Sequence, residues 1–251
     1  MRNIPRASSL NDHSIMPPRF HCPVPLAADT LLSLPASVAH HVRVLRLRAG
    51  EPVILFDGSG QDFPATLIDG STAQLGQPIP NHREPPLLIT LVQALAVADK
   101  MDWIVQKAVE TGAVAVQPVI SERCVLKLAG DRVGKRVAHW QQIAVAAAEQ
   151  CGRARLCQIH EPANLSRWLA SPFAGQRWIL APGEASALSG MQRPEGPVAL
   201  LVGPEGGWSE SELTLARDAG CQAIALGPRV LRTETAGLAA ISAMMALWGD
   251  Y

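Results

Sequence analysis

The sequence predicts an α/β protein in which a mostly parallel sheet covered by helices follows a smaller N-terminal unit. Three observations carry this prediction. Apolar strand-like runs alternate with helical patterns over residues 87–251, which is typical of parallel sheets. A β-hairpin pattern lies earlier, within residues 52–68. Between the two regions, residues 76–86 contain four prolines and no apolar period, which indicates a linker.

These boundaries divide the chain into four segments. Residues 1–15 have no apolar period, and we expect a disordered extension there, with Met16 as an alternative start. Residues 16–78 form the first compact unit and residues 79–86 the linker. The larger domain, with the alternating pattern, is expected at residues 87–251.

Composition is that of a globular protein without a dominant charge. Of its 251 residues, 48% are hydrophobic and 18% are charged, the latter below the roughly 25% usual for globular chains. Disordered and coiled-coil proteins need more charge and are excluded. The 22 basic and 22 acidic residues cancel, so any nucleic acid or anionic membrane must be held by a local patch.

Cysteine usage and hydropathy predict a soluble cytoplasmic protein. Five scattered cysteines form no C-x-x-C pair, so we expect neither a disulfide framework nor a zinc site. The longest apolar run, Leu238–Trp248, is too short to span a bilayer. The first fifteen residues lack the apolar core of a signal peptide.

The first unit is expected to contain a short helix and a hairpin. Residues 35–45 place Val38 and Val42 on one face at helical spacing. Strands at 52–56 and 63–68 flank the turn sequence Asp-Gly-Ser-Gly, which is a hairpin signature.

Strands and helices then alternate to the end of the chain. The strands are apolar runs, and the helices carry apolar residues three and four positions apart. Strands are expected at residues 87–95, 115–120, 178–181, 198–202 and 223–226. Helices are expected at residues 99–111, 132–150 and 234–248.

Three of the late strands run into similar loops, with the sequences APGE, GPEGG and GPR. The carboxyl ends of parallel strands lie at one edge of the sheet, where ligands bind. Glycine lets the backbone approach a ligand, and proline stiffens the loop. We therefore predict a site in which main-chain groups read an adenine edge. The alternative is that each Gly-Pro pair only ends a strand.

The second and third loops both lead into helices. Ser209 and Glu212 form a capping box, so a helix begins directly after GPEGGW. Neither G-x-x-x-x-G-K-[ST] nor G-x-G-x-x-G occurs, which excludes Walker ATPases and Rossmann dehydrogenases. After the third loop, Arg232 and Glu234 begin the final helix. The helix dipole favours glutamate there and opposes arginine, so Arg232 is the more informative residue, although pairing with a carboxylate could explain it.

Basic residues cluster in two places. One cluster, between residues 40 and 48, contains no acid and includes His40, Arg43, Arg46 and Arg48. The other, between residues 121 and 155, includes Arg123, Lys127 and Arg153. A solvated helix face explains either cluster alone. Two clusters in two domains favour contact with a phosphate backbone, and no acid or cysteine beside the histidine pair supports a metal site.

Several segments together resemble the RsmE type of the SPOUT RNA methyltransferases. The most specific are LLVGPEGGWSESEL and IALGPRVLRTETAGLAA, followed by ALWGD. Earlier segments resemble that family in order, among them HHVRVLRLRAGE, LFDGSG, KMDWIVQKAVETGA, SERCV and HWQQIAVAAAEQCGR. The resemblance covers Met16 to Tyr251. The extension before Met16 departs from the family, and the APGE loop at residues 181–184 matches it more loosely than the other two loops.

The resemblance implies both architecture and chemistry. The N-terminal unit would be a PUA-like β-barrel that binds RNA, and the C-terminal domain would hold a trefoil knot. The protein would be a homodimer that methylates N3 of a uridine in 16S rRNA with S-adenosylmethionine and no metal. Carried over position by position, the cofactor-binding residues would be Leu180, Gly203, Pro204, Glu205, Gly206, Leu226, Gly227, Leu231 and Arg232.

The chemistry assigns hypothetical roles to two residues. Deprotonating uracil N3 puts negative charge on both carbonyl oxygens, which Arg232 could stabilise. Glu234 could accept the proton, or it could only cap the helix. Two other functions stay open: a non-catalytic RNA-binding or ribosome-assembly factor, and a SPOUT enzyme acting on a ribose hydroxyl or on transfer RNA.

Overall fold

The computed structural model describes residues 17–126, 130, 132–181 and 185–251. The chain divides into two compact units. The first contains residues 17–56 and 62–79, and the second contains residues 57–61 and the chain from Pro80 onward. The extension expected at residues 1–15 lies outside the described part of the chain.

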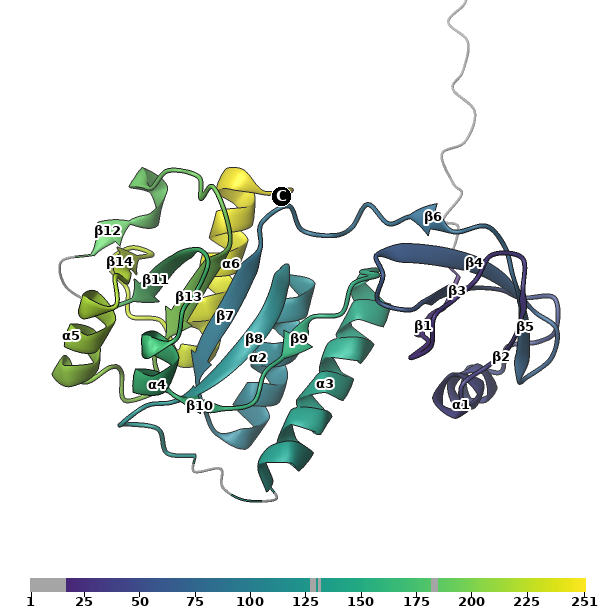
Figure 1. Ribbon diagram of the computed structural model, residues 1–251, viewed down its shortest axis with the longest axis horizontal. Coiled ribbons are helices and arrows are strands. Elements are labelled where there is room, and N and C mark those ends of the chain that lie inside the picture. The colour runs from purple at the N-terminus through teal and green to yellow at the C-terminus, as the bar shows by residue number, and fades with distance from the viewer. Residues whose placement is uncertain (1–16, 127–129, 131, 182–184) are drawn as a thin grey trace, which may run out of the picture. The chain divides into compact units, whose positions relative to one another are not determined.

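The first unit is a six-stranded sheet with one helix (Figure 1). The strand order is β1-β3-β4-β5-β2, and β6 pairs with β4. The predicted hairpin is confirmed, because β3 and β4 pair antiparallel with Val53 opposite Ala65. The predicted helix is α1, whose buried face carries Val38 and Val42. The elements are β1 (Arg19–His21), β2 (Leu31–Ser33), α1 (Ala36–Val44), β3 (Pro52–Phe56), β4 (Gln61–Leu67), β5 (Thr72–Leu75) and β6 (Ile79–Pro80).

The second unit is built on an eight-stranded sheet whose strand pairs are parallel. The order is β10-β8-β7-β13-β11-β14-β12, with β9 on β8. Its strands are β7 (Ile89–Ala94), β8 (Ala113–Ile120), β9 (Gln158–Ile159), β10 (Ala163–Asn164), β11 (Gln176–Leu180), β12 (Ser186–Ala187), β13 (Val198–Val202) and β14 (Gln222–Ala225). Its helices are α2 (Ala98–Glu110), α3 (Arg132–Cys151), α4 (Leu165–Ala170), the 3-10 turn η1 (Leu188–Gly190), α5 (Glu210–Asp218) and α6 (Thr233–Trp248).

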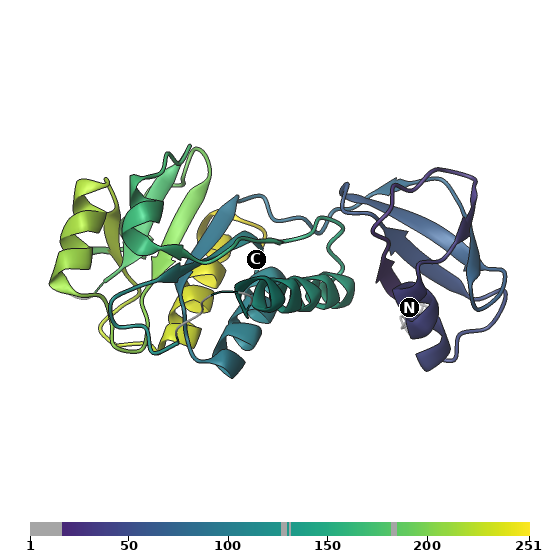
Figure 2. The same cartoon turned by 60° about the horizontal axis from the view of Figure 1, so that its bottom comes forward.

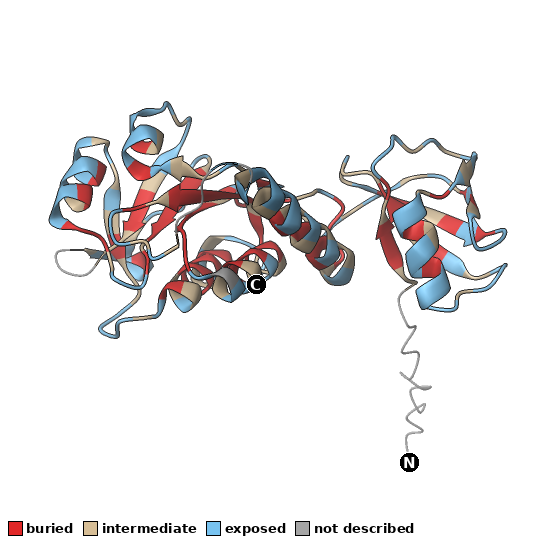
Figure 3. Ribbon diagram, turned by 90° about the horizontal axis from the view of Figure 1, so that it is seen from below, coloured by how far each residue is buried: buried red, intermediate tan, exposed pale blue. Residues whose placement is uncertain are grey.

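Helices cover both faces of this sheet (Figure 2). One face packs against α2 and α6, with α3 beside α2 and against β9, and the other packs against α4 and α5. The strands between these layers are largely buried (Figure 3). Every residue of β13 is buried, as expected for a strand with helices on both faces.

The predicted parallel sheet is therefore confirmed, together with its five predicted strands and its four predicted helices, which include α5 after the GPEGGW motif. The prediction missed the short elements: β9, β10, β12, α4 and η1. Residues 79–86, expected to be a linker, begin with β6. Among the described residues, no helix is both long and apolar enough to cross a bilayer.

Candidate functional site

The three loops singled out in the sequence follow neighbouring strands. β13, β11 and β14 are adjacent and parallel, with Ile179 beside Leu201 and Leu180 beside Ile224. This register ends all three strands at nearly the same level of one sheet edge. The shared edge expected for the loops is confirmed. The residues 182–184 of the APGE loop lie outside the described residues.

Trp208 joins the carboxyl end of β11 to the second loop. Its indole Nε1 donates to the carbonyl oxygen of Leu180 at 3.1 Å, and the residue is only 7% exposed. An added Cβ on Gly203 would lie 3.2 Å from the same indole ring, so the ring packs directly on the glycine backbone. Sequence analysis missed this role of Trp208, although the residue lies inside the quoted GPEGGW motif.

The start of α5 anchors the far end of the second loop. The predicted capping box is present: the Ser209 hydroxyl accepts from the Glu212 N–H, and the Glu212 carboxylate accepts from the Ser209 N–H. The other carboxylate oxygen of Glu212 accepts from the Glu122 N–H at 2.8 Å. Hydrogen bonds from Ser209 and then Ser211 lower the pKa of Glu122. This network holds residues 121–123 against the loop.

Arg123, predicted to bind RNA, spans the second loop. Its Nη1 donates to the carbonyl oxygens of Gly206 at 2.9 Å and Trp208 at 3.2 Å. The side chain packs on the loop as well, because an added Cβ on Gly206 would lie 3.1 Å from the Arg123 Cβ. Arg123 therefore supports this loop. Because the residue is also exposed, its role in RNA binding stays a prediction.

The third loop leads to Arg232, the N-cap residue of α6. Arg232 is exposed, whereas the side chain of Glu234, two positions on, is 17% exposed. Before the helix, Gly227 adopts φ +117°, a conformation that favours glycine, and an added Cβ there would meet no atom within 4 Å. The backbone at this strand end thus borders open space.

Lys100 links the second loop to the start of α6. Its Nζ lies 3.2 Å from the Glu205 carboxylate and 3.2 Å from the Glu234 carboxylate. The two carboxylates raise the pKa of Lys100. A hydrogen bond from its own backbone N–H, followed by Lys100, lowers the pKa of Glu234. Sequence analysis missed Lys100. Its position in the first turn of a helix, where the helix dipole disfavours a cation, is the feature of the sequence that could have indicated it.

Beneath these charges, buried polar groups connect three chain segments. Gln93 at the carboxyl end of β7 donates from Nε2 to the Thr233 hydroxyl at 2.9 Å. The Thr233 hydroxyl donates to the carbonyl oxygen of Gly203 at 2.5 Å. Sequence analysis also missed both residues.

The predicted RNA-binding residues of the first unit form an exposed basic group. His40 and Arg43 lie on α1, and Arg46 and Arg48 follow it; all four are exposed. Arg46 adopts φ +57°, the left-handed conformation that ends many helices, so the chain turns away from α1 there. Lys127 lies outside the described residues.

Arg153, also predicted to bind RNA, requires a correction. It is 3% exposed, and its Nη1 donates to the carbonyl oxygens of Val109 and Ala113 at 3.1 and 2.7 Å. Its Nε lies 3.2 Å from the Glu84 carboxylate, which also accepts from the Ala154 N–H. These partners hold the guanidinium inside the domain, so it cannot reach a phosphate.

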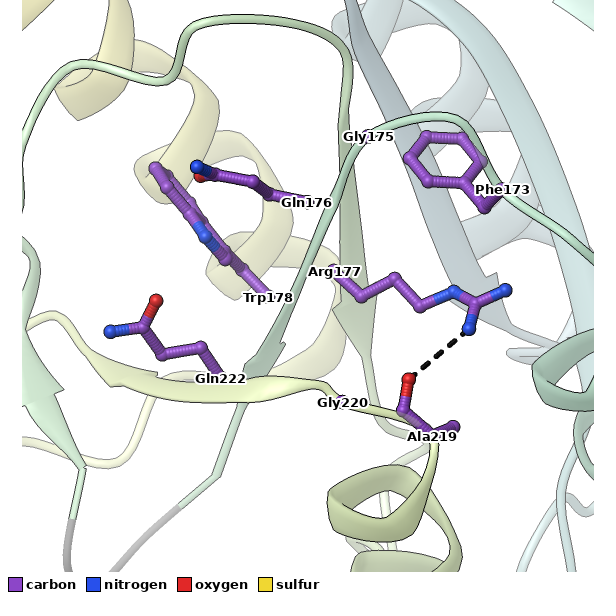
Figure 4. Close-up of a pocket in the computed structure, with 8 residues that line it drawn as sticks. All are labelled: Phe173, Gly175, Gln176, Arg177, Trp178, Ala219, Gly220 and Gln222. Atoms are coloured by element: carbon purple, nitrogen blue, oxygen red, sulfur yellow. Dashed lines mark hydrogen bonds between the residues drawn. The ribbon is translucent and has the colours of Figure 1, made fainter.

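A hollow of about 420 Å³ lies at the opposite sheet edge (Figure 4). It is formed by the amino ends of β11 and β14, with Gln176, Trp178 and Gln222 among its lining residues. Arg177 beside it donates to the carbonyl oxygen of Ala219 at 3.2 Å. The hollow is therefore separate from the three loops. Within the described residues, no three His, Cys, Asp or Glu side chains gather as metal ligands.

Comparison with known proteins matches both units to families. Residues 83–245 match the model of the RNA methyltransferase domain, and residues 34–75 match the RNA methyltransferase PUA domain. The ribosomal RNA small subunit methyltransferase E of Buchnera aphidicola (Schizaphis graminum) is 31% identical over 93% of this chain and 97% of its own length. The protein of the same name from Bacillus subtilis is 32% identical over 82% of this chain and 86% of its own.

Solved structures agree with these matches. A ribosomal RNA small subunit methyltransferase E from Neisseria gonorrhoeae, bound to S-adenosylmethionine, has a TM-score of 0.88 and 40% identity over 93% of this chain and 99% of its own. A Legionella pneumophila protein, in complex with the same cofactor, has a TM-score of 0.88 and 32% identity over 94% of this chain and 99% of its own. The chain belongs to the RNA methyltransferase family, in the group named ribosomal RNA small subunit methyltransferase E.

Proposed function

We propose that this protein transfers a methyl group from S-adenosylmethionine to N3 of a specific uridine in 16S rRNA. The observation that carries the proposal is that β13, β11 and β14 are adjacent parallel strands that end at one carboxyl edge of the sheet, and that glycine and proline follow each of them in the sequence. The related proteins from Neisseria and Legionella, which share this fold at a TM-score of 0.88, were solved with S-adenosylmethionine bound.

The loops suit a cofactor that is held mainly through the main chain. The backbone at Gly227 borders open space. The second loop is held by Arg123, which donates to the Gly206 carbonyl oxygen, and by Trp208, whose ring packs on Gly203 and donates to Leu180. Because the Leu180 carbonyl accepts from Trp208, the carboxyl end of β11 is held against the second loop. The residues proposed to line the cofactor site are Leu180, Gly203, Pro204, Glu205, Gly206, Leu226, Gly227, Leu231 and Arg232.

The cofactor supplies a methyl group on a positively charged sulfur, so the leaving group needs no further activation. The protein then has to orient the uridine and manage its N3 proton. Arg232, exposed at the start of α6, would stabilise the negative charge that deprotonation places on the uracil oxygens. The Glu234 carboxylate would accept the proton directly or through water, and its pKa is lowered by its own backbone N–H and by Lys100.

The first unit would supply part of the RNA-binding surface. The exposed side chains of Arg43, Arg46 and Arg48 carry cationic groups, His40 lies beside them, and no acid lies between these residues in the sequence. Such a group binds phosphates in a salt-dependent way and without base specificity. Uracil N3 is accessible only in an unpaired or flipped base, which a preassembled ribosomal substrate can present.

Three further properties are part of the proposal. The C-terminal domain would be knotted, and the protein would act as a homodimer, as the family resemblance implies. The site would need no metal. Because the substrate is ribosomal RNA, the protein would work in the cytoplasm.

The proposal is tested with purified protein, labelled S-adenosylmethionine and small ribosomal subunits from a strain that lacks the gene. We expect 3-methyluridine at one position of 16S rRNA by nucleoside mass spectrometry. A label on a ribose hydroxyl or on transfer RNA would support a different SPOUT activity. RNA binding without cofactor binding would support a non-catalytic assembly factor.

A further inference from the structure

A buried relay of hydrogen bonds connects the second loop to the start of α6. The amide of Gln93 donates to Thr233, and the hydroxyl of Thr233 donates to the carbonyl oxygen of Gly203. Gln93 is fully buried and Thr233 is 6% exposed. The relay joins residues 140 and 30 positions apart in the sequence, so it ties together segments that no local structure connects.

The direction of the relay is fixed by its ends. Gln93 Nε2 also donates to the Ala94 carbonyl oxygen at 3.1 Å, and a carbonyl oxygen only accepts. The amide nitrogen of Gln93 must therefore face both Ala94 and Thr233. Thr233 then accepts from Gln93, which leaves its single hydroxyl hydrogen for Gly203.

Fold stability does not explain a glutamine at this position. Among the described residues, the Oε1 atom of Gln93 is buried and has no hydrogen-bond partner. An unpaired buried acceptor destabilises a fold, and an apolar side chain of similar length would avoid that cost. What Gln93 does provide is a donor that orients the hydroxyl of Thr233.

We propose that Thr233, oriented by Gln93, is a positioning residue that fixes the second loop relative to the catalytic start of α6. Thr233 lies between Arg232 and Glu234 and points inward, while Arg232 is exposed. The inference rests on the proposed function, because it assumes that this loop holds S-adenosylmethionine. Without the relay, the Gly203 carbonyl loses its partner, and the loop and helix start are no longer held at one geometry.

The test uses substitutions that preserve shape. Thr233→Val keeps the branched side chain and removes the hydroxyl, Thr233→Ser keeps the hydroxyl, and Gln93→Met removes the donor. Thr111→Val is the matched control, because the Thr111 hydroxyl donates to the Lys107 carbonyl oxygen at 2.8 Å in the last turn of α2. Each full-length variant is measured for S-adenosylmethionine affinity by calorimetry and for Tm.

We expect Thr233→Val to weaken S-adenosylmethionine binding about tenfold, as loss of a buried hydrogen bond implies. Thr233→Ser should bind within about twofold of wild type. Gln93→Met should weaken binding in the same direction with little change in Tm, because removal of the unpaired Oε1 offsets the loss of the hydrogen bonds to Thr233 and to the Ala94 carbonyl oxygen. Thr111→Val should leave the affinity unchanged.

The relay is overturned if wild type binds the cofactor and Thr233→Val binds it equally well. It is also overturned if Gln93→Met loses Tm and affinity together and Thr233→Ser fails to restore binding, since that pattern marks a merely structural role. If Thr233→Val does not fold, the affinity and Tm of Gln93→Met alone decide whether the relay positions the loop. A wild-type protein that binds no S-adenosylmethionine would instead refute the proposed function, and the relay's role with it.

Discussion

Replacement of Lys100 by methionine tests how the acidic groups of the site are held. The Lys100 ammonium lies 3.2 Å from both Glu205 and Glu234, and its side chain is 31% exposed. Partly exposed ion pairs contribute about 0.2–1 kcal/mol each, so the two together stabilise the fold by about 0.4–2 kcal/mol. A domain of this size loses roughly 2–4 °C of Tm per kcal/mol, so Lys100→Met should lower Tm by about 1–8 °C.

The same substitution should weaken cofactor binding. Without Lys100, two carboxylates from different segments face each other unpaired, and the loop and the start of α6 separate more easily. We expect Lys100→Met to lose about 1 kcal/mol of binding free energy, which is about a fivefold lower affinity for S-adenosylmethionine, measured by calorimetry. Lys107→Met on the same helix is the matched control, because Lys107 forms one partly exposed pair, with Glu110 at 2.8 Å, and does not join two segments.

The stability difference between wild type and Lys100→Met should depend on pH. The pKa of Glu234 is lowered in the fold, so its contribution is present above its unfolded pKa and is lost as pH falls through the folded pKa. The pKa of Lys100 is raised, so its contribution is present below its unfolded pKa and is lost as pH rises through the folded pKa. The difference should be largest between about pH 5 and pH 10. Equal Tm and affinity for Lys100→Met and Lys107→Met would refute this reasoning.

Four further predictions concern separate parts of the molecule. Arg232→Ala should reduce methyl transfer about 100-fold or more, as does the loss of one donor to a developing oxyanion, and an unchanged rate with normal cofactor affinity would remove Arg232 from the mechanism. Arg43→Ala combined with Arg46→Ala should weaken rRNA binding and flatten its salt dependence without changing cofactor affinity; equal loss of both affinities would contradict separate RNA and cofactor surfaces. Ser209→Ala should cost about 1 kcal/mol of stability through loss of the helix cap, read as a lower Tm, and an unchanged Tm would contradict the capping role. Burial raises the pKa of Cys157 to about 12, so its thiol should resist alkylation at pH 8 in the native protein and react after unfolding; rapid native alkylation would show that it is accessible.

The fold could be predicted from sequence where a strand or helix is long enough to show a pattern of apolar residues. β7 and β13 are buried on both faces and appear as continuous apolar runs, and α2 and α3 carry clear helical spacing. The two-residue strands β9, β10 and β12 carry no period, because two residues cannot display one. Their positions are set by pairing with neighbours distant in the sequence.

The candidate site could be predicted in part for a similar reason. Its loops are marked by their own local sequence, and Arg232 stands out because a helix start disfavours a cation. The partners of these groups are remote: Lys100 is 105 positions from Glu205, and Gln93 is 140 positions from Thr233. Arg153 shows the same limit, since its burial depends on Glu84, 69 positions away, which charge clustering cannot reveal.

Primer extension across 16S rRNA tests the central claim most directly, because a methyl group on uracil N3 blocks base pairing and stops reverse transcriptase. RNA from a strain lacking the gene should be read through at one uridine where RNA from the parent strain gives a stop. Restoring the wild-type gene should return that stop, and restoring the Arg232→Ala gene should not. A stop that persists in the strain without the gene would contradict the assignment of this activity to the three loops and the start of α6.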